Sequence, residues 1–274
     1  MLTRTISGII GAILVITVLF FNASVPLIIN ALIALVCILS MNELFCAMGL
    51  KKRNLLAVPS LLFAGIVPLA GTAAILLNGW YIYTLVVFAI LIFYYETISF
   101  KNVTMIYTLS LIITFSLTSL IMMRNETGRF GTFYILLALC TSWMADTGAY
   151  FCGSLFGKRK LCPKISPKKT VEGALGGLII SVMSVLLVCF IFDKWVFGGS
   201  VQMNYMLAAG MAAVGSIISI IGDLSFSVVK RGCHIKDFGN VIPGHGGILD
   251  RIDSVIFVAP YVYFFIKTFP LLSA

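Results

Sequence analysis

One short stretch near the end of the chain concentrates residue types that can bind metal ions and phosphate. In the sequence GHGGILDRIDS, residues 244–254, three glycines and His245 accompany Asp250, Arg251 and Asp253. The two aspartates are spaced i and i+3, which places both carboxylates on one face of a helix. A glycine-rich segment that runs into a helix N-terminus is also suited to hold phosphate. The alternative for Asp250 alone is a first-turn residue that the helix dipole stabilises.

A second group of polar side chains lies just upstream, in the sequence GDLSFSVVKR. Asp223, Ser227 and Lys230 are spaced i, i+4 and i+7 and therefore share one helical face. This face offers a carboxylate, a hydroxyl and an ammonium group, and Arg231 follows directly. Lys236, in the next loop, adds a further hydrogen-bond donor that could bind phosphate. Two alternatives to a ligand-binding role remain. Asp223 could form a buried pair with a lysine, and the loop could be a flexible turn.

The third polar group surrounds a basic loop. Asp146 lies near the end of an apolar segment, and six Lys and Arg residues follow between positions 158 and 169. Donors at the start of a helix suit polyphosphate. A loop that only fixes membrane topology is the alternative. The candidate donors before the next apolar segment are Ser166, Lys168, Lys169 and Thr170.

These three groups suggest one shared site. A charged side chain within an apolar span is unfavourable unless it has a partner, and cations are natural partners for Asp146 and Asp223. Hard oxygen ligands without a histidine or cysteine cluster favour magnesium, which is commonly shared with substrate phosphates. With two basic loops at the same membrane face, the pattern indicates phosphoryl or nucleotidyl transfer that involves a lipid.

The composition places these polar groups in an integral membrane protein. The chain has 274 residues, of which 60% are hydrophobic and 11% charged, and its mean hydropathy is +1.08. A soluble domain carries roughly 25% charged residues. Apolar runs of about the length needed to cross a bilayer recur throughout, so we predict an all-α fold of membrane-spanning helices. Seven scattered cysteines without a C-x-x-C pair predict neither a disulfide framework nor a zinc site.

We predict nine spans with the N-terminus in the cytoplasm, with eight or ten spans as alternatives. This orientation leaves only four of the nineteen Lys and Arg residues outside the cytoplasmic segments, in agreement with the positive-inside rule. Residues 1–125 would hold five spans, and residues 126–274 would hold four spans and the site. Gly173 and Gly177, spaced G-x-x-x-G, predict close helix packing. The four outer basic residues are Arg124, Arg129, Lys194 and Lys267. The predicted spans are 5–22, 25–50, 55–77, 79–95, 103–123, 132–152, 172–193, 205–228 and 250–269.

The polar motifs carry a family resemblance. The stretch SVVKRGCHIKDFGNVIPGHGGILDRIDS, residues 227–254, resembles the signature of phosphatidate cytidylyltransferases, also called CDP-diacylglycerol synthases. It contains S-x-x-K-R, K-D, P-G-H-G-G and D-R-x-D in that order. The upstream segments DTGAYFCGSLFGKRKL and SPKKTVEG are similar to the other polar region of that family. The resemblance covers the C-terminal half by motif and the N-terminal half by hydropathy alone, with no departure at the polar positions.

The resemblance implies a reaction and a set of site residues. The phosphate of phosphatidic acid would attack the α-phosphorus of CTP, giving CDP-diacylglycerol and diphosphate. A two-cation centre is implied, with Mg²⁺ as one ion and K⁺ as the candidate for the second. Asp223 and Asp250 are the first choices for metal ligands, and Asp146 and Asp253 are the second choices. The expected catalytic residues are Asp223, Lys230, His245 and Asp250. The expected substrate-binding residues are Ser166, Lys168, Lys169, Thr170, Ser227, Arg231, Lys236 and Arg251.

The expected partners are CTP, phosphatidic acid and membrane lipid, with a second copy of the chain as a candidate and no nucleic acid. The expected location is a bacterial cytoplasmic membrane, with the site facing the cytoplasm. Two other classes of function remain open. A cation-coupled transporter also carries carboxylates within its spans, although residues 55–123 hold almost no ionisable groups. A CTP-dependent lipid kinase would instead yield CDP and a phosphorylated lipid.

Overall fold

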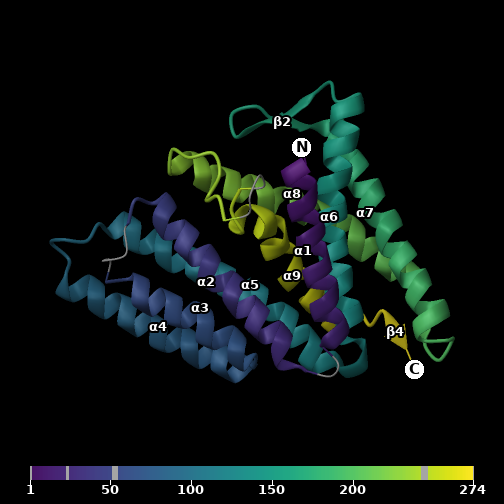
Figure 1. Cartoon of the computed structure of the whole chain (residues 1–274), viewed down its shortest axis with the longest axis horizontal. Coiled ribbons are helices and arrows are strands. Elements are labelled where there is room, and N and C mark those ends of the chain that lie inside the picture. Colours follow the sequence, from purple (N-terminus) through teal and green to yellow (C-terminus); the bar gives the residue numbers. More distant parts are fainter. Residues whose placement is uncertain (1, 23–24, 51–54, 242–245, 274) are drawn as a thin grey trace. The chain divides into compact units, whose positions relative to one another are not determined.

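The computed structural model describes residues 2–22, 25–50, 55–241 and 246–273, and most of these residues are helical (Figure 1). Long apolar runs form helices because a helix satisfies its backbone hydrogen bonds within the segment. Eight of the nine predicted apolar ranges overlap a single helix each. The described helices are α1 Leu2–Phe21, α2 Leu27–Ala47, α3 Ala57–Ala70, α4 Ala73–Phe93, α5 Phe100–Thr127, α6 Gly131–Phe156, α7 Val171–Ile191, α8 Tyr205–Gly232 and α9 Leu249–Thr268.

Five helical stretches in the described residues are long and apolar enough to cross a membrane. One of them, Phe100–Phe156, joins α5 and α6 through the short 3-10 helix Gly128–Phe130. Helix α3 is apolar but has only 14 residues, which is fewer than the roughly 20 that a bilayer requires. The helices therefore support membrane integration of the chain. The other four stretches are Leu27–Ala47, Ala73–Phe93, Val171–Val196 and Tyr205–Gly232.

The all-α expectation holds for nearly the whole described chain, but two short antiparallel strand pairs depart from it. Strand β1, Lys160–Cys162, pairs with β2, Ser166–Thr170, in the basic loop between α6 and α7. Strand β3, Gln202–Met203, pairs with β4, Leu272–Ser273. Strands of two to five residues are too short for an alternating pattern to reveal them. The β1–β2 pair matters for function because β2 carries all four of the candidate phosphate-binding residues Ser166, Lys168, Lys169 and Thr170.

The third predicted span, residues 55–77, is wrong at its C-terminal end. Helix α3 stops at Ala70 because Gly71 adopts a left-handed conformation with φ of +63°. Thr72 then caps α4, and its hydroxyl accepts a hydrogen bond from the backbone N–H of Ile75. The sequence stays apolar across this break, so hydropathy alone could not locate it.

Replacing Gly71 by alanine is expected to destabilise the protein more than the same change at Gly49. Both glycines have positive φ, of +63° and +69°, so both substitutions introduce backbone strain. A Cβ on Gly71 would also lie 2.6 Å from Ile121 Cγ2, whereas nothing lies within 4 Å of one on Gly49. Overpacking costs about 1–3 kcal/mol, so thermal unfolding in detergent should show that additional loss for Gly71→Ala. Equal losses for the two variants would contradict this packing.

The chain forms two compact units. Unit 1 comprises Met1–Asn125 and Gly232–Ile252. Unit 2 comprises Glu126–Arg231 and Asp253–Ala274. Helix α9 begins in unit 1 and continues in unit 2. Polar residues that the sequence singles out are found in both units.

Glycines bring α6 and α7 close together in unit 2. A Cβ on Gly177 would lie 2.5 Å from the carbonyl oxygen of Ala145, and one on Gly173 would lie 2.7 Å from that of Ala149. Side chains larger than hydrogen would therefore force the helices apart, which confirms the predicted packing role of these glycines. The close approach brings the start of α7, with its cap residue Thr170, against the end of α6.

Candidate active site

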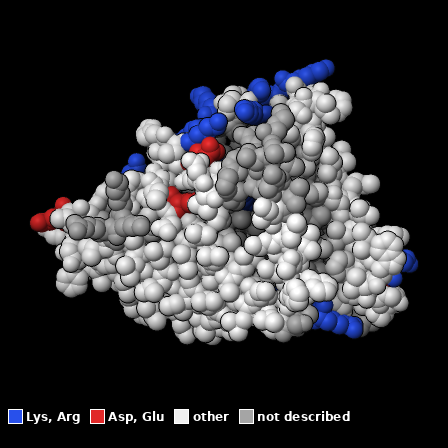
Figure 2. Space-filling model, viewed as in Figure 1, with Lys and Arg blue, Asp and Glu red and all other residues white. Residues whose placement is uncertain are grey.

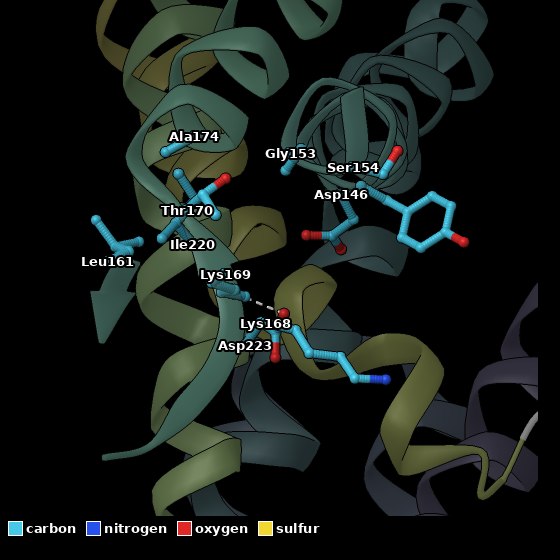
Figure 3. Close-up of a pocket in the computed structure, with 12 residues that line it drawn as sticks. Asp146, Gly153, Ser154, Leu161, Lys168, Lys169, Thr170, Ala174, Ile220 and Asp223 are labelled. Atoms are coloured by element: carbon cyan, nitrogen blue, oxygen red, sulfur yellow. Dashed lines mark ion pairs between the residues drawn. The ribbon is translucent and has the colours of Figure 1, made fainter. Parts of the chain in front are cut away.

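Unit 2 contains a cavity of about 350 Å³ that is lined by several of the predicted site residues (Figure 3). Its volume lies in the range of roughly 300–1,000 Å³ that is usual for small-molecule sites. Helices α6 and α8 and strand β2 contribute the polar side chains, while the remaining wall is mostly apolar. The predicted residues that line it are Asp146, Lys168, Lys169, Thr170 and Asp223.

An ion pair between Asp223 and Lys169 lies at this cavity. The Nζ atom of Lys169 is 2.6 Å from Oδ2 of Asp223, so β2 and α8 are linked by opposite charges (Figure 3). The hydroxyl of Ser227, one turn after Asp223, donates to Oδ1 of the same carboxylate at 3.3 Å. The side chains of Lys169 and Asp223 are 21% and 27% exposed, but the Nζ atom of Lys169 is itself buried. The predicted helical face thus holds a partly solvated carboxylate with a lysine and a hydroxyl against it.

A second lysine–aspartate pair joins α8 to α9. Lys230 Nζ lies 3.8 Å from Oδ2 of Asp253, and the two side chains are only 12% and 8% exposed. A buried charge requires compensation, and each of these residues supplies it to the other. The pair therefore fixes Lys230, a predicted catalytic residue, beside Asp253, a second-choice metal ligand.

Asp146 is held by serine hydroxyls. Its Oδ2 accepts a 2.7 Å hydrogen bond from Ser254, and its Oδ1 accepts a 3.4 Å bond from Ser219. Ser142 in turn donates to Ser254 at 2.8 Å, which orients that hydroxyl. The sequence interpretation missed these three serines. Spacing offered a signal for one of them, because Ser219 lies one turn before Asp223 on the same face of α8.

The β1–β2 pair positions the basic loop at the cavity. The hydroxyl of Thr170 accepts from the N–H of Gly173 and so caps α7, while Lys168 and Lys169 lie beside it in β2. The carboxylate of Glu172 accepts hydrogen bonds from the backbone N–H groups of residues 158 and 159, which ties the loop to the first turn of α7. Ser166 pairs in register with Cys162 and is not among the cavity-lining residues.

Unit 1 contains the other polar centre, around Asp250. Its Oδ2 accepts hydrogen bonds from the backbone N–H groups of Phe238 at 2.9 Å and Gly247 at 3.1 Å. Asp250 lies in the first turn of α9, where the helix dipole also favours a negative charge. This carboxylate therefore folds the loop before α9 back onto the start of the helix. His245, the remaining predicted catalytic residue, lies outside the described residues.

The other predicted cationic residues are exposed. Arg231 is in the last turn of α8, and Arg251 is in the first turn of α9. Lys236 is exposed in the loop between the two helices. Unit 2 thus holds Asp146, Asp223, Lys230 and Asp253 together, while Lys236, Asp250 and Arg251 belong to unit 1.

The donor chemistry of the cavity suits a hard cation. The carboxylate oxygens of Asp146 and Asp223, which line the cavity, are of the kind that Mg²⁺ prefers. In the part of the chain that the structure describes, no three Asp, Glu, His or Cys side chains converge into a ligand cage. Mg²⁺ characteristically takes only one or two carboxylates and completes its coordination with water and substrate phosphates. The residues present therefore fit an ion that enters with a phosphorylated substrate.

Positive charge is concentrated on the loop that contributes Lys168 and Lys169 to the cavity wall. In Figure 2, blue atoms gather along the upper edge of the view, where Figure 1 shows the β1–β2 pair. Phosphate groups would be attracted to this loop, and the lysines would neutralise charge as a phosphate enters. The combination of a basic rim, two lysine–aspartate pairs and a small cavity can bind a polyphosphate and stabilise negative charge on it. The exposed basic residues of the loop are Lys158, Arg159, Lys160, Lys164 and Lys168.

Comparisons with known proteins agree with this chemistry. A model of the cytidylyltransferase family matches residues 2–269 of the chain. A phosphatidate cytidylyltransferase of Bacillus subtilis is 43% identical over 141 residues, which are 52% of this chain and 50% of the relative. Proteins of the same name from Staphylococcus aureus strain COL and Haemophilus influenzae are 44% and 45% identical, over 49% and 50% of this chain and 49% and 47% of the relatives. In these alignments the chain spans about half the length of the curated relatives it matches.

Proposed function

The chain belongs to the cytidylyltransferase family, and from this premise we propose that it converts CTP and phosphatidic acid into CDP-diacylglycerol and diphosphate. The observation that carries the proposal is the cavity of unit 2, where Asp223 and Lys169 form an ion pair beneath a basic loop. The names of the relatives, which are phosphatidate cytidylyltransferases, agree with this substrate pair. The enzyme would thus be a nucleotidyltransferase of phospholipid biosynthesis.

The proposed reaction needs charge stabilisation more than it needs a base. An oxygen of the lipid phosphate would form a bond to the α-phosphorus of CTP, and the bond from that phosphorus to the bridging oxygen of the β-phosphate would break. Diphosphate would leave with the electron pair of that bond. Because the attacking phosphate is already an anion, the protein must chiefly position phosphates and neutralise their charge.

Lysines and hydrogen-bond donors of the β1–β2 loop would position the phosphates and neutralise their charge. Lys168 and Lys169, at the cavity, would bind the triphosphate and neutralise the negative charge that develops on the departing diphosphate. Thr170 lies at the start of α7, where backbone N–H groups without a partner in the helix attract anions. Lys230 would hold phosphate near Asp253. The further substrate contacts that we propose are Ser166, Ser227, Arg231, Lys236, His245 and Arg251.

We propose Mg²⁺ as the cofactor and K⁺ as the second cation. Asp223 and Asp250 are the proposed ligands, and Asp146 and Asp253 would assist. When bound, the ions would supply positive charge to the oxygens of the reacting phosphates. The serines around Asp146 would keep its carboxylate oriented for this role.

We also propose the placement of the protein in its membrane. Nine helices would span a bacterial cytoplasmic membrane, with the N-terminus and the cavity on the cytoplasmic side, where CTP is dissolved. The distribution of basic residues supports this orientation. A homodimer would be the assembled form. Phosphatidic acid would reach the site from the surrounding lipid.

Diphosphate release by the purified protein tests the proposed reaction. Protein in detergent micelles with CTP, Mg²⁺ and phosphatidic acid is expected to release diphosphate, because the lipid phosphate displaces it from CTP. Omitting phosphatidic acid, or replacing it with diacylglycerol, should abolish the release. Release that does not depend on phosphatidic acid would contradict the proposal.

A further inference from the structure

Glu43 is a buried carboxylate near the end of α2, a mostly apolar helix of unit 1. Its side chain is only 5% exposed. A carboxylate in such a position is costly unless hydrogen bonds compensate it. Glu43 is not itself part of the polar motifs described above, and it lies 205 positions before Ile248 in the sequence.

Two backbone N–H groups at the start of α9 supply that compensation. Ile248 donates to Oε1 of Glu43 at 2.8 Å, and Leu249 donates to Oε2 at 2.9 Å. The first N–H groups of a helix have no partner within the helix and carry partial positive charge. Glu43 therefore caps α9 from a different helix and uses both of its carboxylate oxygens to do so.

Two glycines of the preceding loop fit closely against the same carboxylate. A Cβ on Gly247 would lie 2.5 Å from Oε2 of Glu43, and one on Gly239 would lie 2.8 Å from Oε1. Neither glycine has a positive φ, so close approach, and not backbone conformation, is what requires glycine at these positions. The loop and the Glu43 side chain are thus complementary in shape as well as in charge.

Asp250 also binds the segment that Glu43 holds, residues 247–249. Gly247 donates its N–H to Oδ2 of Asp250, while the next two N–H groups along the chain donate to Glu43. Three consecutive backbone donors are therefore fixed by two carboxylates. Movement of Glu43 would release Ile248 and Leu249, the residues that directly precede Asp250.

We infer that Glu43 is a positioning residue, which aligns Gly247, Ile248 and the first turn of α9 so that Asp250 is held in its working geometry. The effect of Glu43 on the reaction rests on the proposed function, whereas its effect on the loop does not. The inference gives α2, in the N-terminal half of the chain, a direct role in the site. Supporting residues of this kind typically change activity by about ten- to hundredfold.

The first test is Glu43→Gln, with Glu96→Gln as the matched control. Glutamine keeps the size of the side chain but turns an NH₂ group toward one of the two N–H donors, so one hydrogen bond must be lost. We expect kcat for diphosphate release to fall by about ten- to hundredfold. We also expect faster hydrogen–deuterium exchange in peptides that contain residues 247–250. Glu96 is exposed and accepts from the adjacent Tyr95, so its variant should match wild type in both measurements.

The second test leaves Glu43 intact and disturbs its contact. Gly247→Ala would place a methyl group against Oε2 of Glu43, whereas Gly232→Ala meets nothing within 4 Å. We expect lower kcat and faster exchange at residues 247–250 for Gly247→Ala alone. In a Glu43→Ala background, the change at Gly247 should add little, because the clashing carboxylate is absent.

The outcomes separate a positioning role from general stabilisation. Exchange that rises only at residues 247–250, together with a lower kcat and an unchanged KM for CTP, supports the inference. Wild-type exchange and kcat in Glu43→Gln would overturn it. If Glu43→Gln does not fold, wild-type behaviour of Gly247→Ala would overturn it instead. If wild-type protein forms no diphosphate, the proposed function fails, while the exchange measurement still decides whether Glu43 holds the loop.

Discussion

Replacing Asp223 by asparagine is expected to lower the rate of CDP-diacylglycerol formation by at least about a hundredfold. Asparagine preserves the volume of the side chain but removes the negative charge that lies 2.6 Å from Lys169. The cavity then loses its proposed cation ligand, and Lys169 loses the partner that orients it. A phosphate-transfer site that works by positioning and electrostatics depends strongly on both. The measurement is the initial rate with purified variant and wild type under identical conditions.

Asp193→Asn is the matched control for this prediction. Asp193 lies in unit 2 but outside the cavity, where its carboxylate accepts from the hydroxyl of Tyr205 at 2.9 Å. Its variant should retain a rate close to wild type. Both variants must also extract and migrate on size exclusion as wild type does. Near-normal turnover by a well-folded Asp223→Asn variant would refute the assignment of the site.

Replacing Lys230 by methionine is expected to lower the free energy of unfolding by about 3–5 kcal/mol. The change leaves Asp253, which is 8% exposed, without the ammonium group 3.8 Å away. A buried carboxylate whose partner is removed must either stay charged in a desolvated site or take up a proton, and either outcome costs stability. Adding Asp253→Asn to this variant should recover part of the stability, because the uncompensated charge disappears. Activity should stay low in the double variant, since neither of the proposed site groups is restored.

Lys267→Met provides the comparison for Lys230. Lys267 pairs with Glu126 at 2.8 Å, but the two side chains are 51% and 38% exposed. Solvent screens such a pair, so its loss should cost less than about 1 kcal/mol. Denaturant unfolding in detergent measures both variants on the same scale. Equal losses for Lys230→Met and Lys267→Met would contradict the buried character of the Lys230–Asp253 pair.

The helices could be predicted from the sequence because the bilayer imposes both their length and their apolar composition. Hydropathy could not locate the helix ends that are set by backbone conformation. Gly71 ends α3 through a left-handed conformation within a continuous apolar run. The β1–β2 pair was equally hidden, because its strands lie in a polar loop and are too short to show alternation.

Much of the candidate site could also be predicted, since each charged residue in an apolar segment is conspicuous. The spacing of Asp223 and Ser227 predicted their shared face, and their hydroxyl–carboxylate contact follows from it. Partners from other elements could not be predicted in this way. The pairing of Lys169 with Asp223 depends on how β2 meets α8, which no local pattern encodes.

Glu43 shows the same limit more clearly. As a single acid near the end of an apolar helix, it looks in the sequence like a residue of the membrane interface. Its partners are backbone N–H groups of Ile248 and Leu249, and backbone groups leave no trace in a side-chain pattern. Only the folded chain brings α2 to the start of α9. A lone acidic residue in an apolar helix can therefore serve to cap the start of another helix.

The phosphorus of CTP that becomes attached to lipid distinguishes nucleotidyl transfer from phosphoryl transfer. Purified protein would be incubated with Mg²⁺ and micelles that contain both phosphatidic acid and diacylglycerol, with CTP labelled at either the α- or the γ-phosphorus. The account predicts that lipid acquires the α-label, while the γ-label is recovered in diphosphate. Transfer of the γ-label to lipid, with CDP as the second product, would identify a lipid kinase and contradict the account. Absence of both labels from the lipid would contradict it as well.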